Sequence, residues 1–357
     1  MGLGAIIVVR ANREIFSQET SSEPPASITE AGLLAEPLAG CEILGRSTLE
    51  RIIERFVRAD VDVISVLVQA EVFPLAPFRE SFGNVSIHVA SDIDAAIARK
   101  LREYSMNGVQ WSFVQCAETY TETDLLDLFY FHREARQAAT RAFDREGALA
   151  LWVVDCGMSV EPGVVTVLRE AGRNHASYFV RGYVHRLIHP RNLREMAADM
   201  LHGRCEKGIT GKEIRPGVWI DEGARIHSRA RIVGPAYIGC RSRVRADTLI
   251  TRSSSVERDC CVDYGTVIED SSVLPHTQIG IWLDVCHAVA NGNRLFSLKR
   301  DVAIEILDPS VMRSSVAVMS ADAGATDWNE ARLMAADFER EYLTQGTWQW
   351  DANLIQE

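Results

Sequence analysis

The sequence lacks long apolar runs, an excess of basic residues and a signal peptide. No apolar stretch is long enough to span a bilayer, which predicts that the chain has no membrane span. The 38 Lys and Arg residues against 49 Asp and Glu residues give a net charge of −11, which argues against a nucleic-acid or anionic-membrane partner. The first residues contain no basic segment or small-residue cleavage site, so we expect a cytoplasmic protein.

Closely spaced cysteine pairs are also missing, although the chain has eight cysteines. They are Cys41, Cys116, Cys156, Cys205, Cys240, Cys260, Cys261 and Cys286. None forms a C-x-x-C pair, and seven stand in apolar or small-residue positions. This pattern indicates reduced thiols and argues against a zinc site.

Glycine is missing directly after the first apolar stretch. Residues 4–9 predict a β-strand, and the next glycine is Gly32. Because glycine lets a backbone approach a phosphate group closely, a glycine-rich phosphate loop is excluded at this strand end. Arg10 and Arg13 stand there instead, and their guanidinium groups are candidate phosphate clamps. The alternative interpretation is that both are solvated loop charges.

A strict period of six is the strongest pattern in the chain. The aliphatic residues at this interval are Ile214, Ile220, Ile226, Ile232, Ile238, Val244, Ile250, Val256, Val262, Ile268 and Leu274. A small or β-branched residue follows four positions after each of the first ten. The pattern resembles the hexapeptide-repeat, left-handed β-helix family, in which the aliphatic side chains fill the interior and three hexads form a coil. Residues 214–279 therefore predict about three and a half coils.

Strands and helices alternate before the repeats. Apolar runs predict strands over residues 61–68, 85–89, 109–116, 149–154, 164–168 and 178–184. Periodic stripes predict helices over 49–57, 93–101, 123–143 and 193–201, with Ser47 and Glu50 as a capping box before the first and Ser91 with Asp94 opening the second. The order predicts a Rossmann-like α/β sheet with crossover helices.

Three domains follow from these patterns. Residues 1–208 are expected to form the α/β domain, and residues 209–290 the β-helix. Residues 291–357 predict strands over 294–306 and 315–319 and a last helix opened by Asp327 and Glu330, packed on the β-helix or on an oligomer partner. Trp282 and Phe296 are expected to plug the open end of the β-helix.

Three stretches of the first 208 residues resemble the sugar-1-phosphate nucleotidyltransferases, such as the GDP-mannose and UDP-N-acetylglucosamine pyrophosphorylases. The sequence E-P-L-A-G at 36–40 is similar to the P-K-P-L segment, and residues 113–132 are similar to the central strand, metal-binding loop and "F-H" helix. Residues 178–203 are similar to the "G-Y-W-x-D-I-G" strand and the helix that follows. The resemblance implies an α/β nucleotidyltransferase-type domain, a nucleotide-sugar or sugar-phosphate ligand and, in an active member, Mg²⁺.

The chain departs from that family at the positions that carry its chemistry. The phosphate loop is replaced by R-A-N-R-E at 10–14, and the family lysine by Glu36. The first metal aspartate aligns with Glu118, which becomes the candidate metal ligand. The second aligns with Arg186, in the motif that begins at Gly182. The resemblance therefore implies Arg10, Arg13, Arg46, Glu118 and Gly182 as nucleotide- or sugar-binding candidates.

Three functions remain open at this point. A catalytically degenerate relative would bind or scaffold in sugar-nucleotide or polysaccharide metabolism, because phosphoryl transfer depends on electrostatic stabilisation that these replacements remove. An active nucleotidyltransferase would need Arg10, Arg13 and Arg46 to clamp phosphates. A hexapeptide-repeat acyltransferase would use a histidine as general base, and His227, His276 and His287 are the histidines in or near the repeats.

A cluster of arginines stands at outward positions of the repeats. It comprises Arg225, Arg229, Arg231, Arg241, Arg243 and Arg245. Side chains at equivalent positions stack in ladders, so the cluster predicts either a solvated face paired with acids or a contact face for an anion or a subunit. By analogy with the family, we expect a homo-oligomer through the β-helix.

Overall fold

The computed structural model describes residues 2–10, 37–72, 82–157, 164–171, 177–206 and 208–315. The chain divides into two compact units, Met1–Gly208 and Ile209–Glu357. Arg13, Glu36 and the helix expected from Asp327 lie outside the described residues, as does most of the strand expected over 315–319. Within the described ranges, no helix is long and apolar enough to cross a membrane.

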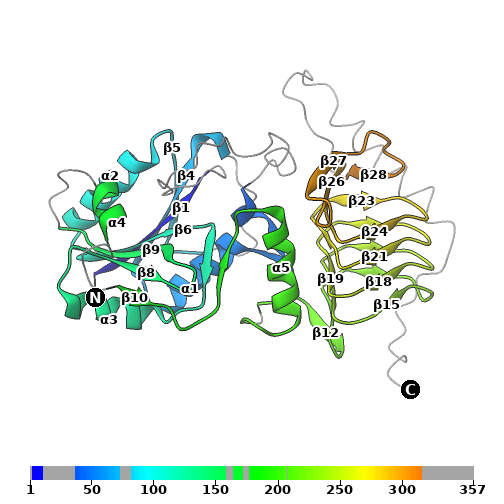
Figure 1. Ribbon diagram of the computed structural model, residues 1–357, viewed down its shortest axis with the longest axis horizontal. Helices are drawn as coiled ribbons and strands as arrows, with labels where there is room; N and C mark the ends of the chain where they lie inside the picture. Colours follow the sequence, from blue (N-terminus) through cyan, green and yellow to red (C-terminus); the bar gives the residue numbers. More distant parts are fainter. Residues whose placement is uncertain are drawn as a thin grey trace. The chain divides into compact units, whose positions relative to one another are not determined.

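The first unit is built on a mixed sheet whose described strands have the order β10-β8-β9-β6-β1-β4-β5 (Figure 1). They are β1 (Leu3–Val9), β4 (Val63–Gln69), β5 (Val85–Ala90), β6 (Trp111–Cys116), β8 (Ala139–Phe143), β9 (Ala148–Asp155) and β10 (Tyr178–Phe179). Strand β1 runs parallel to β4 and to β6, whereas β9 is antiparallel to β6 and β8. Two short antiparallel pairs, β2 (Glu42–Ile43) with β3 (Arg46–Ser47) and β7 (Thr119–Thr121) with β11 (Val184–Arg186), stand apart from this sheet.

Helices contact both faces of the sheet. They are α1 (Thr48–Arg58), α2 (Ile93–Met106), α3 (Leu125–Ala135), α4 (Val164–Glu170) and α5 (Pro190–Leu201), with short 3-10 turns η1 (Leu38–Gly40) and η2 (Ala70–Val72). Residues of α2 and α4 join the core cluster that contains Ile6 and Val114. On the opposite face, Phe56 of α1 lies 5.3 Å from Phe113, measured between ring centroids. Because successive side chains of a strand alternate between faces, Phe113 and Val114 serve opposite layers.

The predicted capping box is confirmed at the start of α1. The Ser47 hydroxyl accepts a hydrogen bond from the Glu50 amide at 3.1 Å, and the Glu50 carboxylate accepts one from the Ser47 amide at 2.8 Å. The start of α2 differs from the prediction, because its N-cap is Asp92, which accepts a hydrogen bond from the Ala95 amide at 3.0 Å.

Two other assignments were wrong. The helix expected over 123–143 ends at Ala135, because Arg136 adopts a left-handed conformation with φ 49°, and the chain then forms β8. The strand expected over 164–168 is the helix α4. Both errors concern apolar segments whose partners lie far away in the sequence, and a short apolar run does not by itself distinguish a strand from a buried helix.

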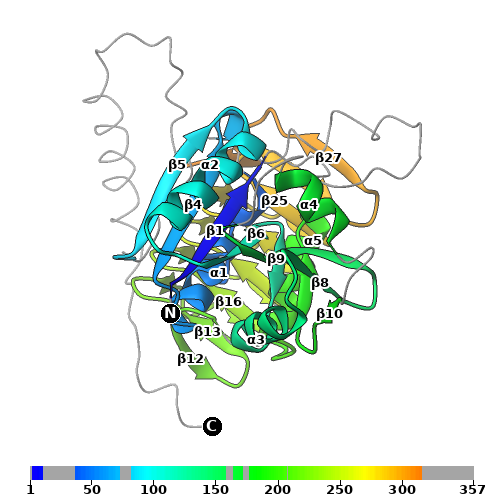
Figure 2. The same ribbon diagram turned by 90° about the vertical axis from the view of Figure 1, so that its left-hand side faces the viewer.

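The order of connections places a topological switch point at β1. The chain leaves β1, forms β4 and β5 on one side, and then returns to form β6 on the other side (Figure 2). The carboxyl ends of β1 and β6 are neighbours, since the Ala117 amide donates to the Val8 carbonyl at 2.9 Å. In open α/β sheets, ligands bind in the crevice outside such a point.

In the second unit, called here the repeat unit, three sheets stack successive short strands. The first holds β12 (Lys212–Arg215), β13 (Val218–Ile220), β16 (Ala236–Ile238), β19 (Ser254–Val256), β22 (Ser272–Val273), β25 (Ala288–Asn291), β26 (Arg294–Ser297) and β27 (Val302–Glu305). The second holds β14 (Arg225–Ile226), β17 (Arg243–Val244), β20 (Cys261–Val262), β23 (Thr277–Ile279) and β28 (Met312–Ser314). The third holds β15 (Arg231–Ile232), β18 (Leu249–Thr251), β21 (Val267–Glu269) and β24 (Asp284–Cys286).

Strands of successive layers pair in parallel with a fixed offset. Val218 pairs with Ala236, Arg225 with Arg243 and Arg231 with Leu249, each 18 residues further along. Their aliphatic neighbours form one buried cluster along the unit. Three parallel sheets linked in this way are compatible with the predicted β-helix (Figure 1), and the left hand of the coil stays a prediction.

The sixfold count needs correction at both ends. Ile214 is 37% exposed and lies in β12, which is antiparallel to β13, so it is not an interior residue. After Ile268 the offset falls from 18 to 17, because Ser255 pairs with Ser272. Val273, not Leu274, is therefore the next member of the core cluster.

The two aromatic residues expected to plug the end of the coil behave differently. Phe296 is fully buried in β26, the strand that turns back antiparallel on β25. Trp282 is 69% exposed, so the prediction for it was wrong. Its ring lies over Gly265, where an added Cβ would come within 2.7 Å of the indole.

The alternation between interior and surface can be tested at neighbouring residues of β18. Ile250 is fully buried, whereas Leu249 is half-buried on the outward side. We expect Ile250→Ala to destabilise the repeat unit by about 2–5 kcal/mol through lost burial and cavity formation. Leu249→Ala should cost less than about 1 kcal/mol. Amide hydrogen exchange in β18 and β21 measures both changes, and equal losses would contradict the inward assignment of Ile250.

Candidate functional site

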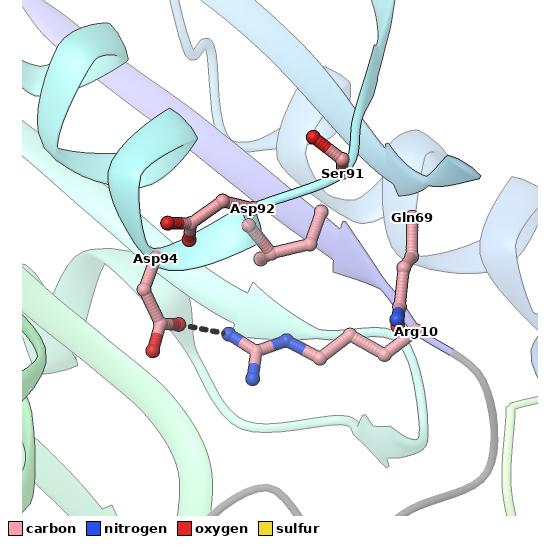
Figure 3. A pocket seen from close by; sticks show the side chains of 6 residues that line it. Arg10, Gln69, Ser91, Asp92 and Asp94 are labelled. Atoms are coloured by element: carbon pink, nitrogen blue, oxygen red, sulfur yellow. Dashed lines mark hydrogen bonds and ion pairs between the residues drawn. The ribbon is translucent and has the colours of Figure 1, made fainter. Parts of the chain in front are cut away.

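A pocket of about 230 Å³ lies at the carboxyl ends of β1, β4 and β5. Its lining residues are Arg10, Gln69, Ser91, Asp92, Ile93 and Asp94 (Figure 3). Arg10 follows β1, Gln69 ends β4, and the other four connect β5 to the first turn of α2. The parallel direction of the three strands brings these chain-distant residues to one edge of the sheet.

An ion pair spans this pocket. Nη2 of Arg10 donates to Oδ1 of Asp94 at 2.6 Å, as the dashed line in Figure 3 marks. The Arg10 side chain is 16% exposed and the Asp94 side chain 45%. Nε of Arg10 is buried and has no hydrogen-bond partner among the described residues. Arg10 is thus neutralised on one side and has an unsatisfied donor on the other.

The start of α2 carries its own negative charges. Asp92 caps the helix, and Asp94 lies in its first turn. A free helix N-terminus favours an anionic ligand, but these carboxylates already occupy that position. With two carboxylates and one guanidinium, the pocket offers mainly hydrogen-bond acceptors. Such a lining suits hydroxyl groups better than phosphate.

Glu118 lies beside Arg10 at the switch point. Its backbone is fixed, since the Leu187 amide donates to the Glu118 carbonyl at 2.7 Å. Burial raises the pKa of the Glu118 carboxyl to about 7, although hydrogen bonds from backbone amides and the charge of Arg10 act in the opposite direction. Within the described part of the chain, Oε2 of Glu118 is buried and has no partner. Perturbed carboxyls of this kind are concentrated at functional sites.

The structure brings together only two of the predicted candidates. Arg10 and Glu118 interact, because an Arg10 amide hydrogen bond and the Arg10 charge both act on the Glu118 carboxyl. Arg46 is bound elsewhere, with Nη1 donating to Oε2 of Glu54 at 3.0 Å. Gly182 packs against the backbone of Glu122, where an added Cβ would lie 2.8 Å from the carbonyl oxygen. Arg13 lies outside the described residues.

The position aligned with the second metal aspartate holds an ion-paired arginine. The two terminal nitrogens of Arg186 donate to the two oxygens of Asp144, each at 2.7 Å, and Nη1 also donates to Glu146 at 2.8 Å. The hydrogen bond to Asp144 raises the pKa of Arg186 further. This network fixes the β8–β9 turn to β11.

The described residues do not fit the magnesium site that the resemblance implies. Glu118 is one carboxylate, Arg186 replaces the other, and Asp94 already accepts from Arg10. Among the residues that the structure describes, no three His, Cys, Asp or Glu side chains lie together as metal ligands. Mg²⁺ prefers an octahedral shell of oxygens that one carboxylate does not supply.

The histidines of the acyltransferase alternative are dispersed. Nδ1 of His227 accepts from the Arg229 amide at 3.1 Å, and Nε2 of His276 contacts Arg258 at 3.0 Å. His287 lies 2.6 Å from Oδ2 of Asp270. Each histidine stands on its own corner contact, and the pocket at β1 contains none of them.

Sequence reasoning missed Asp94 as the partner of Arg10, and Gln69 and Asp92 as pocket residues. The only local signal was the S-D-I-D sequence after a strand, which marks a helix start. The Arg10–Asp94 pair joins residues 84 positions apart, so it depends on the parallel order of β1, β4 and β5.

The raised pKa of Glu118 predicts a specific pH dependence of stability. The folded state binds the proton more tightly than the unfolded state, so the stability contribution of Glu118 is lost as pH rises through about 7, by about 3 kcal/mol in total. Glu118→Gln should therefore gain stability relative to the wild type between about pH 5 and about pH 8. Amide exchange of β1 and β6 measures this difference. Exposed Glu71→Gln is the control, and parallel pH profiles for wild type and Glu118→Gln would contradict the assignment.

Comparison with known proteins gives a partial likeness. No family model matches the chain. The UTP–glucose-1-phosphate uridylyltransferase of a Synechocystis strain is 25% identical over 140 residues, which are 38% of this chain and 32% of that protein. The chain thus spans about a third of the length of this relative.

A solved structure, a proposed glucose-1-phosphate thymidylyltransferase from Bacillus anthracis in complex with a sucrose, aligns over 54% of this chain and 93% of its own, with 9% identity and a TM-score of 0.36. At that score nothing about this chain follows from the alignment. The sequence similarity therefore supports the resemblance at one level: part of this chain is similar to a sugar-1-phosphate nucleotidyltransferase.

Proposed function

We propose that this chain is a catalytically degenerate, sugar-nucleotidyltransferase-like protein that binds the sugar part of a nucleotide sugar or sugar phosphate at the switch-point pocket. The observation that carries the proposal is the Arg10–Asp94 pair across that pocket, with the buried Glu118 carboxyl beside Arg10. The partial similarity to a UTP–glucose-1-phosphate uridylyltransferase supports the ligand class.

The charges of the pocket support sugar recognition over phosphate recognition. Carboxylates accept hydrogen bonds from hydroxyl groups, and the Gln69 amide and Ser91 hydroxyl can both donate and accept. A phosphate in the same position would meet Asp92 and Asp94 and would have to displace Asp94 from Arg10. Like charges at close range disfavour that exchange.

The absence of transfer chemistry is supported by Arg186. Phosphoryl transfer needs cations and donors that neutralise charge developing on the phosphate oxygens. Arg186 cannot ligate a metal, and its donors are already bound to Asp144 and Glu146. An active transferase would require Mg²⁺ to be held by Glu118 without a second carboxylate from this position.

A scaffolding role complements binding. The repeat unit is a rigid stack of short parallel strands, and such stacks support assembly through their faces. We propose that it assembles copies of the chain as a homo-oligomer in the cytoplasm, where the eight free cysteines stay reduced. Light scattering of the full chain tests this part, and a monomer at all concentrations would contradict it.

The ligand assignment is tested by isothermal titration with UDP-glucose, GDP-mannose and glucose 1-phosphate. If a sugar hydroxyl binds to the ion pair, Arg10→Met and Asp94→Asn should each weaken binding by about tenfold or more, the loss of one charge-assisted hydrogen bond. Arg46→Met removes an arginine tied to Glu54 and should leave affinity unchanged. Tighter binding by Asp94→Asn would mean that Arg10 holds a phosphate, which contradicts sugar recognition.

The degenerate assignment is tested separately, by pyrophosphate release from a panel of nucleoside triphosphates with sugar 1-phosphates and Mg²⁺. We expect no turnover above background. Turnover that Glu118→Ala abolishes would overturn the non-catalytic proposal and establish Glu118 as a metal ligand.

A further inference from the structure

The second sheet of the repeat unit carries an unusual column of outward side chains. Its members, called here the outward column, are Arg225, Arg243, Cys261, Gln278 and Arg313. They are neighbours in register on β14, β17, β20, β23 and β28. The alternate residues of the same strands, such as Val244 and Val262, are fully buried in the core. The column therefore lies on the face of this sheet turned away from the core.

Other arginines of the repeats are paired with acids one layer further on. Arg229 contacts Asp247 at 3.0 Å, Arg241 contacts Asp259 at 2.6 Å, and Arg245 contacts Asp263 at 3.4 Å. Each of these acids stands 18 residues after its arginine. This part of the predicted cluster is a solvated, acid-paired face.

The outward column breaks this rule. The residue 18 positions after Arg225 is Arg243, and the next one is Cys261. Neighbouring strands lie about 4.8 Å apart, and like charges directly opposite each other are destabilising. The column contains three arginines and no acid. The positive charge reaches Cys261, where Arg245 and Arg243 partly offset the rise in thiol pKa that burial causes.

A strongly acidic part of the same chain begins at this sheet. Residues 316–357 contain eight acidic residues and two arginines. They are Asp322, Asp327, Glu330, Asp337, Glu339, Glu341, Asp351 and Glu357, with Arg332 and Arg340. Strand β28 ends at Ser314, is the last strand of the sheet, and contributes Arg313 to the column.

Length does not limit contact between the two. The column spans five strands, which at about 4.8 Å for each of the four spacings makes about 19 Å. A segment that starts at one end of this column and has 42 residues can reach the other end even if it is helical, at about 1.5 Å per residue.

We propose that acidic residues of segment 316–357 bind to the outward column of the same chain and neutralise Arg225 and Arg243. A tethered acidic segment is present at high effective concentration, which favours it over a free polyanion. A second copy is disfavoured as the source, because each copy carries a net charge of −11. This inference does not depend on the proposed ligand of the first unit.

Proteolysis of the full chain tests the proposal. Trypsin cleavage after Arg332 and Arg340, followed by mass spectrometry, should be faster by about tenfold in Arg225→Ser/Arg243→Ser than in the wild type. The control Arg231→Ser/Arg300→Ser removes two other exposed arginines and should be cleaved at the wild-type rate. Salt should accelerate cleavage of the wild type and the control but not of the double variant. Equal rates in all three proteins would overturn the proposal.

Alkylation of Cys261 gives an independent readout. Removal of Arg243 by itself should slow the reaction, because a neighbouring cation favours the thiolate. Release of the acidic segment should instead expose Cys261 and accelerate it. The segment variant Asp337→Asn/Glu339→Gln/Glu341→Gln should also accelerate it, without any change in the sheet.

Dilution separates the two possible origins of the segment. Binding within one chain predicts that protection of Cys261 and of Arg332 is independent of protein concentration. Protection that disappears on dilution, together with a dimer in light scattering, would show a second copy as the occupant and would overturn binding within the chain.

Discussion

Strand β1 is the constraint on which the first unit depends. All seven of its residues are buried, and it pairs in parallel with β4 on one side and β6 on the other. A strand buried on both faces fixes its register through its neighbours, because a slip of one residue would exchange the two side-chain layers. That register brings Arg10 beside Glu118 and opposite Asp94. The pocket is therefore a consequence of how the sheet is wound.

The same charges are used differently in the two units. In the first unit, Arg10 and Arg186 are each tied to acids from distant segments, and the cost of burial appears in the perturbed carboxyl of Glu118. In the repeat unit, ion pairs recur at a fixed offset along exposed corners. Exposed pairs contribute little to stability, so the repeats depend on their aliphatic interior instead.

The sequence predicted what is periodic or local. The period of six identified the interior from Ile226 to Ile268 because each layer repeats the environment of the one before. The Ser47 capping box was likewise predictable from residues three positions apart. The end of α3 at Arg136 was not, since β8 is defined by pairing with β9 and not by its own sequence. Arg10 and Glu118 could be proposed because they follow strands, but Asp94 depended on strand order.

The shortened coil after Ile268 has a consequence for how the repeat unit comes apart. In a stack where each layer contacts only its neighbours, unfolding free energy is a sum of local contributions. Layers before Ile268 share one spacing, and layers after it share another. The boundary between them is the natural fracture plane of the stack. Under load or denaturant, we expect the layers on either side to separate there as two cooperative blocks, each melting as a whole.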